Sequence, residues 1–112
     1  MTQLVPIIMG SKSDLNQGSA IAAALSGYCI ESDIRVASAH KAAAFVIGLL
    51  HDYEDDPRPK VYVTVAGRSN ALSGLVDGNV SSPVIACPPH SDKFGGADIY
   101  SSLRMPSGIA PA

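Results

Sequence analysis

Apolar residues gather in four short runs along the chain, and segments with helical spacing separate these runs. The runs cover residues 3–9, 30–37, 61–66 and 83–87, and valine or isoleucine recurs in each. Short runs of this kind are typical of buried strands. The second run alternates with Glu31, Asp33 and Arg35, which predicts a strand nearer the edge of the sheet. Pro6 has no N–H, so the ladder of the first strand must begin after it or be interrupted there.

Segments 14–26, 42–53, 71–78 and 97–104 are predicted to be helices, with Gly27 as a plausible stop for the first. The inward positions expected from the spacing are Ile21, Ala22, Leu25, Tyr28, Phe45, Val46, Leu49, Leu50, Leu72, Leu75 and Val76. Residues 54–59, 91–96 and 105–112 are rich in proline, glycine or polar residues, so we expect them to be irregular.

Strands that alternate with helices predict a three-layer α/β fold. This is an αβα sandwich with a flavodoxin-like or Rossmann-like parallel sheet, and the expected strand order is 2-1-3-4. Right-handed crossovers place all strand-end loops at one edge, and the order reverses between the first and third strands. At 112 residues, the chain has room for one domain, 1–112.

Composition excludes several classes of protein. The chain is 46% hydrophobic and 16% charged, which suits a buried sheet and not a disordered chain. Its net charge is −2 without a basic run, so we expect no nucleic-acid partner. We expect no membrane segment or signal peptide, and therefore a cytoplasmic protein. Cys29 and Cys87 lie in strand-like runs and are interpreted as reduced core residues, with no metal spacing around them.

The first strand ends in a turn that could hold an anion. Gly10, Ser11, Lys12, Ser13 and Asp14 offer backbone amides and hydroxyls at the start of a helix. Asp14 could cap that helix or accept hydrogen bonds from the hydroxyls of a ligand. The spacing is not that of a Walker loop, and a plain capped helix start remains an alternative.

The second strand ends at Ser38, Ala39, His40 and Lys41. The positive charge of Lys41 disfavours protonation of His40, which leaves a neutral imidazole able to accept a proton near pH 7. The alternative is a capping histidine beside a solvated lysine. The other two histidines, at positions 51 and 90, are interpreted as surface residues.

The third strand stops at Gly67, and Arg68, Ser69 and Asn70 then place a cation, a hydroxyl and an amide at its carboxyl end. Alone, this could be an ordinary polar turn. The predicted topology, however, puts the three loops around one crevice. The sequence therefore predicts one site made of an anion cradle, a proton-transfer histidine and a polar clamp.

Several of these segments resemble the PurE family, phosphoribosylaminoimidazole carboxylase. They are Met-Gly-Ser-Lys-Ser-Asp at 9–14, Ser-Ala-His-Lys at 38–41, Ala-Gly-Arg-Ser-Asn-Ala-Leu-Ser-Gly at 66–74, and segments 83–89 and 101–108. The mutase class of this family usually has Ser-Ala-His-Arg and Ala-Gly-Gly-Ala-Ala-His-Leu-Pro-Gly. Lys41 and the Arg68-Ser69-Asn70 loop resemble the second class, which acts directly with CO2.

The resemblance implies a step of de novo purine biosynthesis, the carboxylation of 5-aminoimidazole ribonucleotide (AIR) to 4-carboxy-5-aminoimidazole ribonucleotide (CAIR). It implies no ATP, biotin or metal. The resemblance also implies roles for the site residues. The phosphate lies near Ser11, Ser13 and Lys41, and Asp14 binds the ribose hydroxyls. His40 moves the proton, and the imidazole and carboxylate are bordered by Ser38, Gly67, Arg68, Ser69 and Asn70.

Family members continue past Met-Pro-Ser-Gly with a helical region that helps build a homo-octamer. This chain is therefore expected to be a C-terminally truncated form, and a sheet without that covering region would expose apolar surface. The alternatives to the direct carboxylase are a mutase, a non-catalytic nucleotide-binding or assembly module, and a generic flavodoxin-like domain that binds another phosphate ligand.

Overall fold

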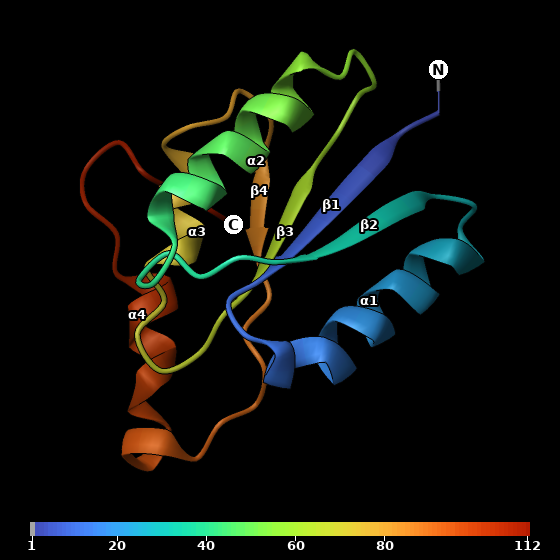
Figure 1. Ribbon diagram of the computed structural model, residues 1–112. Coiled ribbons are helices and arrows are strands. Elements are labelled where there is room, and N and C mark those ends of the chain that lie inside the picture. The colour runs from blue at the N-terminus through green and yellow to red at the C-terminus, as the bar shows by residue number, and fades with distance from the viewer. Residues whose placement is uncertain (1) are drawn as a thin grey trace.

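Four parallel strands form the centre of the computed structural model, which describes residues 2–112 (Figure 1). They are β1 (Leu4–Met9), β2 (Glu31–Val36), β3 (Tyr62–Val65) and β4 (Val84–Ala86). Their order is β2-β1-β3-β4, so the predicted 2-1-3-4 order is confirmed, with β2 at an edge. The reversal between β1 and β3 therefore lies where the sequence placed it.

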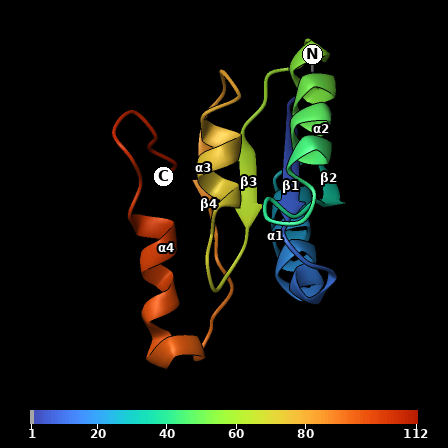
Figure 2. The same cartoon turned by 60° about the vertical axis from the view of Figure 1, so that its left-hand side comes forward.

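Helices cover both faces of the sheet and give the predicted three layers. On one face, α1 (Leu15–Gly27) follows the short helix η1 (Lys12–Asp14) and packs on residues of β1 and β3 such as Ile7 and Val65. On the other, α2 (Ala43–Asp55) and α3 (Leu72–Asp77) enclose Ile8 and Tyr62. Figure 2 shows η2 (Lys93–Ile99) and α4 (Tyr100–Leu103) beside the carboxyl ends of β3 and β4.

Pro6 interrupts one ladder of β1 and leaves the other intact. The pairing with β2 runs without a break from Leu4 to Met9. Towards β3, Leu4 N donates to Pro59 O at 3.0 Å and Gly10 N donates to Val65 O at 2.9 Å. The N–H groups of even-numbered residues thus face β3, and Pro6 has none. The ladder to β3 accordingly has a bridge at Leu4 and resumes at Ile7, which matches the predicted interruption.

Three packing expectations are wrong. Tyr28, in the turn after α1, is 80% exposed. Phe45 is 55% exposed, because the buried side of α2 is formed by Val46, Leu49, Leu50 and Tyr53. Cys29 is exposed and lies outside β2, in the turn after α1, where its φ is 58°. The chain must reverse direction there, so the thiol does not reach the core.

Residues 105–112 are irregular, as predicted, and return to the sheet at their end. Ala112 N donates to Val84 O at 2.8 Å, and Ala86 N donates to Ala112 O at 2.9 Å. Ile85, on the face that carries α1, is 43% exposed. No helix of the described chain is long and apolar enough to cross a membrane.

Candidate functional site

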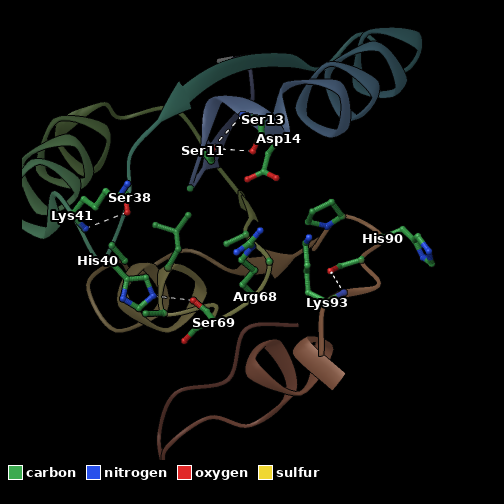
Figure 3. A pocket seen from close by; sticks show the side chains of 18 residues that line it. Ser11, Ser13, Asp14, Ser38, His40, Lys41, Arg68, Ser69, His90 and Lys93 are labelled. Atoms are coloured by element: carbon green, nitrogen blue, oxygen red, sulfur yellow. Dashed lines mark hydrogen bonds between the residues drawn. The ribbon is translucent and has the colours of Figure 1, made fainter. Parts of the chain in front are cut away.

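A cavity of about 600 Å³ opens at the carboxyl ends of the four strands (Figure 3). Each of the four strand-end loops contributes to its wall. Its lining comprises Gly10, Ser11, Ser13, Asp14, Ser38, Ala39, His40, Lys41, Ala66, Gly67, Arg68, Ser69, Ala71, Leu72, Pro89, His90, Ser91 and Lys93. All predicted site residues except Asn70 are among them. The crossover topology therefore gathers three segments that are far apart in the sequence.

The turn after β1 presents two hydroxyls and a carboxylate. Ser13 N donates to Ser11 Oγ at 3.2 Å, and the two hydroxyl oxygens lie 2.9 Å apart. The bond from Ser13 N makes Ser11 the N-cap of η1, and Asp14 N donates to the Ser11 carbonyl oxygen at 3.1 Å. Burial raises the pKa of the Asp14 carboxyl, and the hydrogen bond from the backbone of this turn opposes that shift. This wall can donate hydroxyl hydrogens to an anion and accept from sugar hydroxyls.

His40 is oriented by the loop after β3. Its Nε2 lies 2.9 Å from Ser69 O. Because a carbonyl oxygen only accepts hydrogen bonds, Nε2 carries the proton in this arrangement. In the neutral ring, Nδ1 is then the nitrogen that can accept a proton. On the same turn, Lys41 N donates to Ser38 Oγ at 3.2 Å, which fixes the start of the segment before α2.

The loop after β3 is held in place by the segment that follows β4. Arg68 adopts a φ of 59°, and its N–H donates to Asp98 Oδ2 at 3.0 Å. This hydrogen bond lowers the pKa of Asp98. Ser101 Oγ donates to Asp98 O at 2.7 Å and accepts from Asn70 N at 2.9 Å. The left-handed turn that aims Arg68 at the cavity therefore depends on η2 and α4.

Asn70 does not border the cavity, contrary to the expectation from sequence. It is 5% exposed, and its amide nitrogen donates to Ser73 Oγ and Ser102 Oγ, both at 2.8 Å. Its amide oxygen accepts from Ser73 N at 3.1 Å, as a helix-capping side chain does. These three hydrogen bonds commit the side chain to joining α3 and α4.

The loop after β4 contributes cavity residues that the motifs did not identify. Pro89, His90, Ser91 and Lys93 line the wall on the side away from His40 and Lys41 (Figure 3). The His90 ring points away from the cavity and lies 3.5 Å from Asp92, whereas the Lys93 side chain points inward (Figure 3). The strand-end rule alone could have found this loop, because it follows a parallel strand like the other three.

Positive charge exceeds negative charge in the lining of this cavity. Lys41, Arg68 and Lys93 face a single carboxylate, Asp14, although the whole chain carries a net charge of −2. No salt bridge within residues 2–112 involves any of the three cations. The same part of the chain contains no group of three or more His, Cys, Asp or Glu arranged to hold a metal ion. The excess of positive charge suits the cavity to an anion.

Comparison with known proteins gives one consistent family. The family model described as AIR carboxylase matches residues 4–112. A phosphoribosylaminoimidazole carboxylase of Treponema denticola is 60% identical over 112 residues, which are all of this chain and 70% of the relative. One of Archaeoglobus fulgidus is 60% identical over 105 residues, 94% of this chain and 57% of the relative. The mouse bifunctional phosphoribosylaminoimidazole carboxylase/phosphoribosylaminoimidazole succinocarboxamide synthetase is 45% identical, and the match covers 25% of it.

Solved structures agree with these matches. The crystal structure of Treponema denticola PurE has a TM-score of 0.96 and 60% identity, and the match covers 98% of this chain and 70% of that one. A second crystal structure, of Treponema denticola PurE2-S38D, has a TM-score of 0.97 and 59% identity, over 100% of this chain and 70% of that one.

Proposed function

The chain belongs to the AIR carboxylase family, and on that premise we propose that it carboxylates AIR directly with CO2 to form CAIR, a step of de novo purine biosynthesis. The observation that carries the proposal is the contact of His40 Nε2 with Ser69 O at 2.9 Å within the cavity. It orients a histidine so that Nδ1 is available as a base. The surrounding hydroxyls and cations suit a sugar phosphate.

The reaction needs positioning and one proton transfer. The aminoimidazole ring carbon is electron-rich, and it forms a bond to the carbon of CO2 while the oxygens become a carboxylate. The ring carbon then loses its proton to His40 Nδ1, which restores the aromatic ring. Holding CO2 beside the ring and placing a neutral base there are both sizeable effects.

The other cavity residues have binding roles in this proposal. Ser11, Ser13 and Lys41 bind the phosphate, and Asp14 accepts hydrogen bonds from the ribose hydroxyls. Ser38, Gly67, Arg68 and Ser69 border the imidazole and the forming carboxylate, where hydrogen-bond donors stabilise the developing charge. Asn70 is left out of this set, because its amide is already bonded to serines of α3 and α4.

The test is turnover of AIR with CO2, compared between the wild type and His40→Gln. The glutamine amide can still donate to Ser69 O, but it offers no basic nitrogen. We expect the variant to bind AIR and to lose about 10²-fold or more in rate. A His40→Gln enzyme with full activity would remove the proposed base.

Two further outcomes separate the alternatives. Turnover of the N5-carboxyamino isomer of AIR, without turnover of AIR and CO2, would indicate a mutase. Binding of AIR by the wild type without any turnover would indicate a nucleotide-binding module. Calorimetry with AIR and a product assay on the same preparation distinguish these outcomes.

We also propose that residues 1–112 act as one domain in a cytoplasmic homo-oligomer. Exposed apolar side chains on β4 and α4 support association, among them Ile85 at 43% and Leu103 at 68% exposure. Light scattering across a dilution series measures the assembly, and a monomer at every concentration would contradict it.

A further inference from the structure

Two cations reach the cavity from neighbouring loops, on the side away from Lys41. Arg68 comes from the loop after β3 and Lys93 from the loop after β4, and Figure 3 shows both side chains pointing into the same part of the cavity. We propose that Lys93, together with Arg68, forms a second anion subsite that holds the carboxylate of CAIR. This inference rests on the proposed function. It concerns a residue that none of the sequence motifs contains.

Two arginines outside the cavity differ from this pair, because carboxylates lie against their side chains. Arg58 pairs with Glu31 and Asp56, and Arg35 pairs with Asp33. Within residues 2–112, Arg68 and Lys93 form hydrogen bonds through their own backbone atoms and not through their side chains. Their side-chain charges therefore remain available to a ligand.

The charge that appears during the reaction matches this pair. The phosphate of AIR carries about −1.5 to −2 at pH 7, and Ser11, Ser13 and Lys41 are assigned to it. Carboxylation adds a further negative charge as the ring proton leaves for His40. The new carboxylate must form near the loop after β3, because His40 is hydrogen-bonded to that loop through Ser69 O. Arg68 is the residue before Ser69 in this loop, and Lys93 enters the same part of the cavity from the loop after β4.

The backbone around Lys93 supports a functional placement. The three residues that follow it, Phe94, Gly95 and Gly96, all have positive φ, at 55°, 64° and 86°. Phe94 is 76% exposed, so packing of its side chain does not explain this conformation. Lys93 N donates to Ser91 Oγ at 3.0 Å, which fixes the start of the turn. Glycine adopts such angles freely, so Phe94 alone is strained here, and strained backbone of this kind is concentrated at ligand clamps.

The test compares the affinities of three ligands, measured by calorimetry on the full chain. They are CAIR, AIR and ribose 5-phosphate, so that only the first has the carboxylate. We expect Lys93→Gln to bind CAIR at least roughly 10-fold more weakly than the wild type does, as for a lost hydrogen bond to a charged group. Its affinities for AIR and ribose 5-phosphate should be unchanged. Lys93→Arg should restore CAIR binding. Arg104→Gln is the matched control, because Arg104 is exposed, lies outside the cavity lining and gives the same change in net charge.

The outcomes keep this inference separate from the proposed function. If the wild type neither binds nor converts AIR, the proposed function fails. If the wild type is active and Lys93→Gln binds all three ligands like Arg104→Gln, only the second subsite is refuted. Equal weakening for all three ligands would place Lys93 on the phosphate and would also overturn the proposal.

Discussion

Replacing Asn70 with alanine tests whether this residue is a structural link or a ligand-binding group. The sequence predicts a substrate contact, whereas the structure places the side chain in a buried network. Alanine removes both bonds from the amide nitrogen and the bond that Ser73 N donates to the amide oxygen. Ser73 Oγ keeps Thr64 Oγ1 at 2.6 Å as a partner, but Ser73 N and Ser102 Oγ lose theirs.

The expected loss of stability follows from these three bonds. Each contributes about 1 kcal/mol net, and buried groups left without a partner add to the cost. We therefore expect the free energy of unfolding to fall by about 3 kcal/mol. This is a large share of the roughly 5–15 kcal/mol that stabilises a typical domain. At about 4 °C per kcal/mol for a domain of this size, the melting temperature should fall by about 12 °C.

Urea unfolding followed by far-UV circular dichroism measures the change, since the chain has no tryptophan for fluorescence. Asn79→Ala is the matched control, because Asn79 is exposed and makes one side-chain bond, to Leu75 O at 2.7 Å. Its free energy of unfolding should fall by no more than about 1 kcal/mol. If Asn70→Ala unfolds like Asn79→Ala but binds AIR far more weakly, Asn70 is a ligand group and the structural argument is refuted.

Three further predictions address the site loop, acid stability and helix propensity. Asp98→Ala removes the acceptor of the Arg68 N–H, so AIR binding should weaken roughly 10-fold. Asp98→Asn keeps an acceptor oxygen and should bind AIR nearly as tightly as the wild type. Equal losses of AIR affinity in the two variants would contradict this prediction. Hydrogen bonds from Arg58 lower the pKa of Asp56 from 3.8 to about 2, so the pair's stabilisation is present above pH 4 and disappears between about pH 4 and 2. The stability difference between the wild type and Arg58→Gln should therefore shrink in acid urea titrations, and a constant difference would argue against the pair. Gly48→Ala, at a helical position with nothing within 4 Å of the added Cβ, should raise the unfolding free energy by about 0.5–1 kcal/mol, and a lower urea midpoint would show an unseen clash.

The fold could be predicted because its signals are local and repeated. Apolar runs and helical spacing define the elements, and the handedness of crossovers then fixes which loops meet. His40, Ser11 and Arg68 reach one cavity for this reason. None of these arguments requires knowledge of side-chain packing.

The wrong predictions concern residues whose environment is set by segments far away in the sequence. Asn70 and Arg68 are close in sequence, yet only the position of α4 decides that one is buried and the other faces the cavity. Phe45 has the right spacing for the core, but the buried side of α2 is formed by its neighbours, such as Val46 and Leu49. Cys29 follows a helix whose end could be placed only approximately, so a turn residue was assigned to a strand. Lys93 belongs to no motif, and only the fold brings it to the site.

The register between β1 and β3 determines how the two sides of the cavity line up. A parallel strand could in principle shift by two residues and keep the same face buried. In the observed register, Gly10 N donates to Val65 O and Gly10 lies beside Ala66. A shift of β1 by two residues would carry the Ser11–Asp14 turn along the sheet by about 6–7 Å relative to Arg68. The alignment of two buried strands, away from the chemistry, therefore decides which hydroxyls stand across from which guanidinium.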